Sequence, residues 1–315
     1  MSEKDSLSMT LATGYHGRAR PLWERRVDTG NLKLEVIPMA DDGERHRRFD
    51  AGEFDAAEYS LGMYLSLKAR NAPVVALPIF PNRRFRHAYI YVPSASTIRK
   101  PQELKGKVVG IPSYLNTCAL WVRGILKDEY AVALQDILWR VGRAEPDVVA
   151  PTGVRIEVLE GKKNLCSRLL AGEIDAAISP DAPQFEVQGV RRLFAAAKEV
   201  EKAYYLKTKV FPIAHAVVVR RHLLDEHPWV AQKLFDIWNE AKRVGLEDDA
   251  DPTYSNFAWI RDLWDEERAL FGPDPWSYGI SRNKAAIEAL IRYGVEQGIL
   301  KERVEPSALF YPIRE

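Results

Sequence analysis

The stretches RRFDAGEFDAAEYS (residues 47–60) and SRLLAGEIDAAISP (residues 167–180) repeat one pattern 120 positions apart, from 47 to 167. In each copy we expect an amphipathic helix to end at a glycine, Gly52 or Gly172, in the left-handed conformation that often follows a helix. A short strand then carries Asp-Ala-Ala toward a loop. This is the helix-to-strand step of an α/β unit, so its repetition predicts two similar lobes.

The composition sets the class of protein. The chain has 315 residues, of which 46% are hydrophobic, and this suffices for two compact units. Its 45 Lys and Arg nearly balance its 44 Asp and Glu, so the overall charge favours neither nucleic acid nor an anionic membrane as a partner. Any preference for anions must therefore be local.

The first residues, MSEKDSLSMTLATGYHG, contain no apolar core of secretory length. No later run reaches the roughly 18 to 20 apolar residues that span a bilayer. We therefore expect a cytoplasmic protein. Two cysteines, Cys118 and Cys166, are too few for a disulfide framework and lack metal-site spacing, so they are predicted to be buried thiols.

Apolar runs outline the two lobes. Strands are predicted at TLATGY, KLEVIPM (33–39), VVALPIF (74–80) and HAYIYVP (87–93), with a helix over 18–26. KPQELKGKVVGIPSY opens a second lobe, which continues through a helix from about Asn116, the strand VRIEVLE and the second Asp-Ala-Ala step. HAVVVRR (215–221) is a further strand, and the remainder is helical.

That helical remainder cannot form a sheet alone, so we expect it to pack on the first lobe. Lobe one is then discontinuous, covering 1–92 and 215–315, and lobe two covers 93–214. The runs that begin at His87 and His215 become the crossover strands between the lobes.

The phrase LKGKVVGIP and the doubled step resemble type II periplasmic solute-binding proteins, including the thiamine-precursor-synthase-like branch. A closer resemblance, from about residue 10 to about residue 300, is to the 4,5-dihydroxyphthalate decarboxylase family. The stretches that carry it are AEYSLGMYL (57–65), PIFPNRRFRHAYIYV (78–92), GIPSYLNTCALWVRGILKDEY (110–130), FPIAHAVVVRR (211–221) and HPWVAQKLF (227–235).

This resemblance implies a two-lobed α/β fold of the type II periplasmic-binding-protein kind. Each lobe would be a mixed sheet flanked by helices, with two crossover strands and a helical C-terminal region. It also implies an enzyme without cofactor or metal. Near the start, TGYHGRARP stands where that family has an acidic, aromatic-rich segment. That loop normally lines the cleft, so His16 and Arg18 are predicted to bind substrate, and a relative of dihydroxyphthalate stays open as the substrate.

Decarboxylation of a phenolic ring requires a proton at the carbon that bears the carboxylate, and histidine suits this role at neutral pH. His87 and His215 are predicted to become neighbours beneath the cleft and to be catalytic; the alternative is a hinge histidine bonded to backbone. Glu58, after the first Asp-Ala-Ala strand, is a third catalytic candidate, which would accept a phenolic proton or orient a histidine. Two histidines and a carboxylate also form a common metal triad, which leaves a metal site as an alternative.

A diacid substrate needs guanidinium groups. Arg83 and Arg86 in NRRFRH and Arg123 on the following helix are predicted to supply them, and the alternative is a solvated basic turn. A strand end and helix start at GIPSYLNTC provide free N–H groups for an anion, although such residues often only cap the helix. The residues there are Ser113, Tyr114, Asn116 and Thr117.

The doubled step places Ser60 and, in the second copy, Ser179, Pro180 and Asp181 at equivalent edges of the lobes, where ligands of open α/β sheets lie. We include Ser60 in the site. Two other groups are left out of it. Trp229, Trp238, Trp259 and Trp264 are interpreted as core residues, and His46–Arg48 as a solvated helix face.

Three functions fit these features. The first is a carboxy-lyase that acts on a hydroxylated benzene dicarboxylate, such as 4,5-dihydroxyphthalate, to give protocatechuate. The second is a solute-binding protein that delivers an aromatic acid to a transporter. The third is a biosynthetic enzyme of the thiamine-precursor or menaquinone type. The expected partner is a small aromatic dicarboxylate, and the helical tail is compatible with a homodimer.

Overall fold

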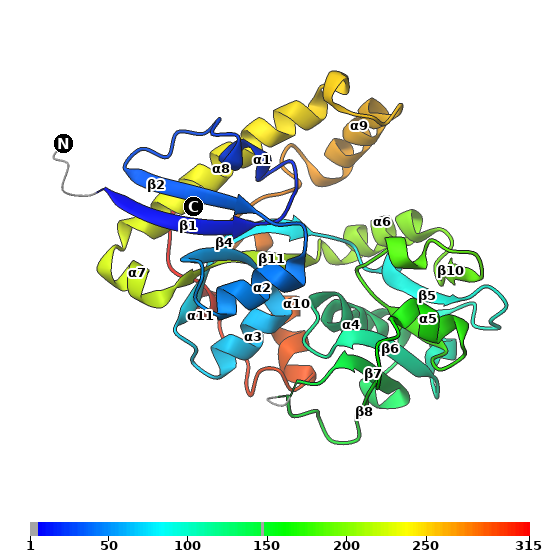
Figure 1. The fold of residues 1–315 in the computed structure, drawn as a ribbon. Helices are drawn as coiled ribbons and strands as arrows, with labels where there is room; N and C mark the ends of the chain where they lie inside the picture. The colour runs from blue at the N-terminus through cyan, green and yellow to red at the C-terminus, as the bar shows by residue number, and fades with distance from the viewer. Residues whose placement is uncertain (1–5, 146–147) are drawn as a thin grey trace.

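A computed structural model describes residues 6–145 and 148–315. It contains two mixed sheets side by side, each flanked by helices (Figure 1), so the predicted α/β architecture with two sheets is confirmed. The first sheet has the spatial order β2 (Leu32–Pro38), β1 (Leu7–Thr13), β3 (Ala56–Ser60), β11 (Ile213–Arg220), β4 (Val74–Arg83). The second has the order β10 (Val190–Arg192), β5 (Ile90–Pro93), β9 (Ala176–Ile178), β6 (Val108–Ser113), β7 (Leu138–Arg143), β8 (Arg155–Val158).

The helices cover these sheets. They are α1 (Arg20–Trp23), α2 (Asp42–Asp50), α3 (Leu61–Ala69), α4 (Thr117–Tyr130), α5 (Leu165–Leu170), α6 (Ala197–Thr208), α7 (Arg221–Glu226), α8 (Trp229–Ala250), α9 (Ile260–Phe271), α10 (Lys284–Glu296) and α11 (Pro306–Leu309). Helices α2, α3 and α8 pack on the first sheet, and α4 and α5 pack on the second. In the part of the chain that the structure describes, no helix is long and apolar enough to cross a membrane.

Both copies of the repeated sequence form the same local structure. Gly52 and Gly172 follow α2 and α5 with φ of 90° and 72°, as the left-handed position after a helix requires. Asp55 then accepts a 2.8 Å hydrogen bond from the Thr10 N–H at β1. In the second copy Asp175 accepts one of 2.8 Å from the Val108 N–H at β6. Each aspartate therefore anchors its own strand to the parallel neighbour.

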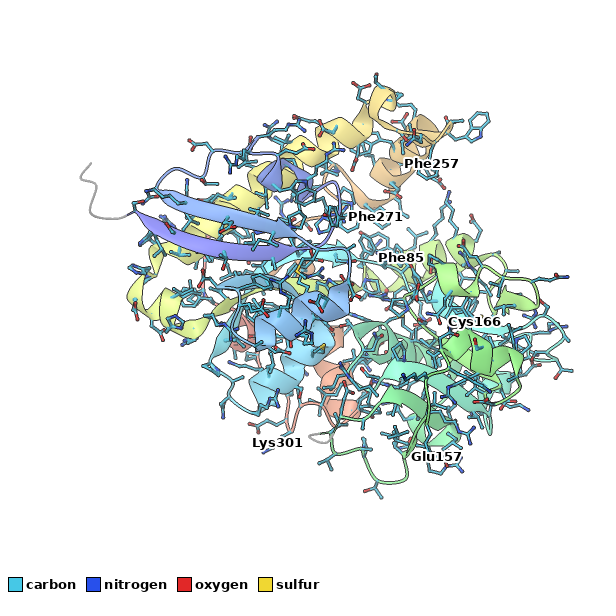
Figure 2. The ribbon with its side chains drawn as sticks, viewed as in Figure 1. Phe85, Glu157, Cys166, Phe257, Phe271 and Lys301 are labelled. Carbon is cyan, nitrogen blue, oxygen red and sulfur yellow. The ribbon has the colours of Figure 1, made fainter. Side chains whose placement is uncertain are left out.

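The connections between the sheets lie side by side. Strands β4 and β11 are antiparallel neighbours, and the Arg84 N–H donates to the Pro212 carbonyl at 3.1 Å just beyond them. An aromatic cluster supports this region, because Phe85 stacks on Phe211 at 4.7 Å and on Phe271 at 6.0 Å. Figure 2 shows Phe85 and Phe271 close together, which joins the end of α9 to the crossover.

Two predicted elements are wrong in extent. The run HAYIYVP is not one strand: residues 87–89 form a turn of 3₁₀-helix, and β5 begins only at Ile90. The helix expected over 18–26 is reduced to α1, because the chain leaves helical geometry at Arg25, where φ is 58°. The other strands and the helical remainder appear where they were predicted.

The helical remainder does not pack on the first sheet alone. Helix α8 contacts β4, as expected, but α10 packs against α4 of the second sheet's layer. The Tyr293 ring occupies the space beside Gly124, and its hydroxyl donates to Asp128 at 2.7 Å. The packing of Tyr293 beside Gly124 and its hydrogen bond to Asp128 thus hold α10 against α4, which covers the second sheet. The lobe boundaries at 92 and 214 stay a prediction.

The tryptophans divide between core and surface. Trp238 is fully buried in the core, as predicted, whereas Trp259 is 73% exposed, so the core interpretation is wrong for it. Trp259 immediately precedes α9, a helix with no buried residue. The amphipathic pattern predicted burial there, but this helix lies at the periphery.

Strand β3 and helix α4 meet at the floor of the cleft. The Ser60 and Thr117 hydroxyls are 2.6 Å apart, and the Gly62 N–H donates to Thr117 Oγ1 at 2.9 Å. The backbones approach so closely that a β-carbon at Gly62 would overlap the Leu115 carbonyl oxygen. The missing side chain of Gly62 therefore permits this contact.

Candidate active site

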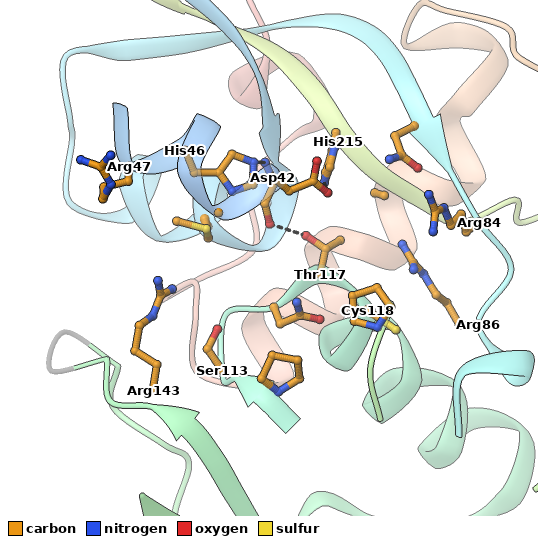
Figure 3. Close-up of a pocket in the computed structure, with 18 of the residues that line it drawn as sticks. Asp42, His46, Arg47, Arg84, Arg86, Ser113, Thr117, Cys118, Arg143 and His215 are labelled. Carbon is orange, nitrogen blue, oxygen red and sulfur yellow. Dashed lines mark hydrogen bonds and ion pairs between the residues drawn. The ribbon is translucent and has the colours of Figure 1, made fainter. Parts of the chain in front are cut away.

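A cavity of about 470 Å³ lies between the two lobes, and Ser60 and Thr117 are among the residues that line it (Figure 3). Helix α2 and the ends of β3 and β4 contribute to one wall, and the β6–α4 turn contributes to the other. The residues that line it are Asp42, Gly43, His46, Arg47, Asp50, Ser60, Met63, Asn82, Arg84, Arg86, Pro112, Ser113, Asn116, Thr117, Cys118, Arg143, Pro180, Ala214 and His215. Its position at the carboxyl ends of parallel strands is typical of ligand sites in open sheets.

His215 is held at the edge of this cavity by its strand and by a buried carboxylate. Its backbone lies in β11 between Ser60 and Asn82, and its Nδ1 is 2.7 Å from Glu58 Oε1. The Nε2 atom lies 3.8 Å from Asp42 Oδ2, on the cavity side. Because Nδ1 donates to the carboxylate, Nε2 is the atom that can exchange a proton with a bound molecule.

Glu58 is fully buried and does not line the cavity. Its Oε2 accepts hydrogen bonds from the Thr13 hydroxyl at 3.0 Å and the Gly14 N–H at 2.8 Å, and lies 2.9 Å from His16 Nε2. Burial opposes ionisation, but His16, His215 and Arg45 outweigh it, so the pKa of Glu58 is held well below its ordinary value. Of the two roles left open for Glu58, this geometry supports orientation of His215.

His46 corrects an expectation, since it is buried and lines the cavity rather than facing solvent. The Ser60 N–H donates to His46 Nε2 at 3.2 Å, so the ring proton is on Nδ1. The neighbouring Arg45 is also fully buried and donates to the Glu58 carbonyl at 2.9 Å. Helix α2 turns this face toward β3, and only Arg47 and Arg48 stay near solvent as predicted.

The pH dependence of stability should reveal His46. Burial, followed by the charges of His215 and Arg45, lowers the pKa of His46 from 6.5 to about 3. The contribution of neutral His46 to the free energy of unfolding is thus complete above pH 6.5. It is lost as the pH falls from 6.5 toward 3, because in that window the imidazole binds a second proton only in the unfolded chain. We expect wild type to lose about 1.4 kcal/mol more per pH unit in this window than His46→Gln, which keeps an acceptor for Ser60. Urea unfolding at pH 7 and pH 5 measures this, and equal slopes would contradict it.

Arg86 is the cation that the cavity holds most deeply. It is 2% exposed and its Nε has no hydrogen-bond partner, and among the described residues no carboxylate lies within 4.0 Å of its guanidinium. A buried charge without a counter-ion is unfavourable unless a ligand supplies one. Figure 3 shows Arg84 beside it, with Arg47 and Arg143 at the opposite end of the cavity. Four arginines against two aspartates, Asp42 and Asp50, favour a dianion.

The turn from β6 to α4 forms the opposite wall. Ser113, Asn116 and Thr117, which were predicted to bind an anion, line the cavity. Asn116 Oδ1 accepts from the Ala119 N–H at 3.1 Å, so it caps α4, and Thr117 Oγ1 is occupied by Ser60 and Gly62. Of these three side chains, that of Ser113 forms no hydrogen bond with any residue that the structure describes. Cys118 also lines the wall; burial raises the pKa of its thiol despite the nearby Arg86, so it stays a protonated thiol, as does the buried Cys166.

Several predicted ligands point elsewhere. Tyr114 donates to the Gln297 carbonyl at 2.9 Å, and Arg123 donates to the Tyr114 carbonyl at 2.6 Å and to Gln297 Oε1 at 2.7 Å. Arg83 donates to Asn283 Oδ1 at 2.5 Å. None of these three lines the cavity. Among the buried arginines of the described residues, only Arg86 lines the cavity, and charge alone does not distinguish it from the others.

The loop after β1 lies behind the cavity rather than in it. His16 contacts Glu58 from the side opposite His215, and its ring is 6.4 Å from that of Trp238. The Arg18 guanidinium stacks 3.4 Å above the Trp276 ring and donates to the Pro81 carbonyl at 3.0 Å. Neither residue lines the cavity, so the expectation that this loop lines the cleft is wrong, and the binding of substrate by His16 and Arg18 stays a prediction.

The predicted meeting of His87 and His215 is also wrong. The 3₁₀ turn rotates His87 beneath α4 and α6, where its ring packs against Phe194 and Tyr204, both at 5.3 Å. Burial lowers the pKa of His87 to about 4, so it is neutral at pH 7. The metal triad of His87, His215 and Glu58 is therefore not formed. Among the residues that the structure describes, no other group of acidic, histidine and cysteine side chains has a metal-binding arrangement.

His87 provides a direct test of this correction. We expect His87→Leu to keep the turnover and the substrate affinity of wild type within about 3-fold, because the ring does not line the cavity and is replaced by an apolar group among aromatic rings, with only Glu201 Oε1 nearby at 4.0 Å. Steady-state kinetics at pH 7 measure this. A loss of turnover comparable to that of a His215 variant would restore His87 to the site.

Sequence reasoning missed Asp42, His46 and Arg143, which all line the cavity. Asp42 and Arg143 follow β2 and end β7, two parallel strands at equivalent positions beside β1 and β6. The rule that ligands lie beyond the carboxyl ends of parallel strands, applied to these strands also, would have found both. His46 had no such signal, because its helix looks polar in sequence.

Comparison with known proteins agrees with the fold. Residues 24–226 match the family described as "ABC transporter, phosphonate, periplasmic substrate-binding protein". The structure resembles the periplasmic sulfonate-binding protein of Methylobacillus flagellatus, with a TM-score of 0.58 and 16% identity over 98% of this chain and 92% of that one. The predicted periplasmic-binding-protein-like fold is therefore confirmed.

Two curated proteins are more similar in sequence. The 4,5-dihydroxyphthalate decarboxylase of Comamonas testosteroni is 32% identical over 321 aligned residues, which cover 97% of both chains. The 4,5-dihydroxyphthalate decarboxylase of Pseudomonas putida is 33% identical over 195 residues, 59% of this chain and 75% of that protein.

Proposed function

The chain belongs to the 4,5-dihydroxyphthalate decarboxylase family, within the wider family of periplasmic substrate-binding proteins, and we propose that it is a carboxy-lyase for a hydroxylated aromatic dicarboxylate. The expected substrate is 4,5-dihydroxyphthalate and the expected product is protocatechuate. The observation that carries the proposal is the pairing, in one cavity, of a buried guanidinium at Arg86, with no described carboxylate within 4.0 Å, and a carboxylate-bound imidazole at His215.

Arg86 would hold the dicarboxylate. A guanidinium binds a carboxylate through paired hydrogen bonds, and these are strong where water is excluded. Arg84 adds positive charge at the same end of the cavity, and Arg47 and Arg143 attract the dianion at the other end. The Ser113 hydroxyl and the Asn82 amide supply neutral hydrogen bonds to the remaining oxygens.

His215 would protonate the ring. In its charged form, Nδ1 donates to Glu58 while Nε2 carries the second proton toward the cavity. The Glu58 carboxylate stabilises this imidazolium and fixes its orientation, so that the proton is delivered to the carbon bearing the leaving carboxylate. The electrons of the broken carbon–carbon bond then restore the aromatic ring and carbon dioxide departs.

The test is turnover of a panel of phthalates by the purified protein. We expect release of carbon dioxide and protocatechuate from 4,5-dihydroxyphthalate, and binding without turnover for phthalate, whose ring has no hydroxyl to accept electrons. Tight binding of every compound without release of carbon dioxide would overturn the proposal and favour a solute-binding protein.

We also propose a cytoplasmic location. Its support is that Cys118 and Cys166 are both unpaired thiols, as is usual in a reducing compartment. Cell fractionation with an antibody against the chain tests this, and recovery in the periplasmic fraction would contradict it.

A further inference from the structure

Asp42 presents to the cavity a carboxylate oxygen that accepts no hydrogen bond from the residues that the structure describes. It is the first residue of α2 and its side chain lines the cavity beside His215. Arg45 Nη2 donates to Asp42 Oδ1 at 2.7 Å, which fixes the carboxylate. Among the described residues, no donor forms a hydrogen bond with Oδ2, and this oxygen lies 3.8 Å from His215 Nε2. A negative group here repels the carboxylates of the substrate but can accept a hydrogen bond from a neutral donor, such as a hydroxyl of the ring.

The geometry points to Asp42 as the group that accepts the phenolic proton of the substrate while His215 protonates the ring. This inference rests on the proposed function and adds to it a second catalytic residue. Oδ2 of Asp42 and Nε2 of His215 lie 3.8 Å apart. A ring that lies with one face against both atoms can therefore present its hydroxyl to Asp42 and the para carbon, which bears the carboxylate, to His215.

The proton and electron flow balances. The phenolic O–H bond breaks toward Asp42 Oδ2, and its electrons pass through the ring to the para carbon. That carbon forms a C–H bond with the proton from His215 Nε2, which gives a ring ketone. The bond to the carboxylate then breaks, carbon dioxide leaves, and the returning electrons restore the phenol, which regains its proton from Asp42. One proton is consumed, and solvent must return it to His215.

The charges around Asp42 favour this order of proton transfers. Burial raises its pKa, but His215 from β11 and Arg45 from α2 outweigh burial and the repulsion by Glu58 from β3, so its pKa lies below its ordinary value. Asp42 is therefore ionised when substrate binds. When His215 gives its proton to the ring, the strongest of these attractive charges disappears. Asp42 thus becomes a stronger base at the step that requires it.

The experiment compares Asp42→Asn with Asp41→Asn. Asp41 is the matched control, because its side chain accepts the Glu44 N–H at the start of α2, at 2.9 Å, does not line the cavity, and asparagine caps a helix equally well. We expect Asp42→Asn to lower the turnover of 4,5-dihydroxyphthalate by about 100-fold or more, the usual contribution of a positioned acid or base. Asp41→Asn should stay at the level of wild type.

A second substrate separates catalysis from structure. A ring-fluorinated 4,5-dihydroxyphthalate has more acidic phenols and needs less help to lose a proton. The ratio of wild-type to Asp42→Asn turnover should therefore be at least several-fold smaller for it. An unchanged ratio, or full turnover by Asp42→Asn, would overturn the role of Asp42.

Binding measurements keep the inference testable if the proposed function fails. Calorimetry should show that wild type prefers 4,5-dihydroxyphthalate to phthalate, and that Asp42→Asn loses this preference by about 10-fold, because a hydrogen bond to a charged acceptor is lost. Absence of turnover in wild type would refute the proposed function alone. Equal selectivity of wild type and Asp42→Asn would refute the assignment of Asp42 alone.

Discussion

Replacement of His215 by asparagine should lower the release of carbon dioxide by about 10²- to 10⁴-fold, the range for removal of a positioned general acid. His215 is the imidazole that both lines the cavity and is bound to a buried carboxylate, at 2.7 Å from Glu58. Asparagine can still donate a hydrogen bond to Glu58, so the carboxylate keeps a partner and the fold should persist. Only the proton donor is lost.

Three measurements make this result interpretable. Thermal unfolding should show that the variant remains folded, and calorimetry should show that it still binds phthalate, because the arginines are intact. His222→Asn is the matched control, since His222 is exposed on α7 and should keep full turnover. Retention of more than a tenth of the wild-type rate by His215→Asn would remove the general acid from the proposed mechanism.

Replacement of Arg86 by methionine should have opposite effects on stability and on function. The free protein should gain about 1 to 3 kcal/mol in its free energy of unfolding, because a buried charge with no described carboxylate within 4.0 Å is replaced by an apolar chain of similar length. Affinity for the dicarboxylate should fall by about 10- to 100-fold, since charged hydrogen bonds are lost. Urea unfolding and calorimetry measure the two quantities.

Ligand-induced stabilisation links the two effects. In wild type, saturating phthalate should raise the melting temperature, whereas in Arg86→Met this increase should be nearly absent. Arg155→Met, at an exposed position on β8, is the control for loss of one positive charge. A destabilised Arg86→Met with unchanged affinity would mean that Arg86 is structural, as Arg123 is.

The repeated step predicted the architecture because it reflects a strong local requirement. A glycine with positive φ and an aspartate that caps the neighbouring strand occur in both copies, and the sequence alone records both residues. The two-sheet fold and the cavity between the sheets follow from this. His215 was also predictable, because β11 is a long apolar strand that fixes its position.

Residues whose direction depends on a turn could not be predicted. His87 and Arg86 are adjacent, yet Arg86 lines the cavity and His87 does not, because the 3₁₀ turn that begins at His87 rotates the chain. Likewise, the burial of Arg45 and His46 depends on how α2 sits against β3, which no pattern in its polar sequence indicates. The residue types in the sequence indicated the chemistry of the site. The local backbone conformation determines which individual arginines and histidines line the cavity.

The width of the cavity depends on Gly62, a residue that does not line it. No atom of Gly62 lines the cavity, yet the absence of its side chain lets α3 rest on the Leu115 carbonyl and brings Ser60 against Thr117. Any side chain at position 62 would act as a wedge and widen the gap between the walls without altering their chemistry. Substrate size can therefore evolve at this position independently of the acid and the arginines.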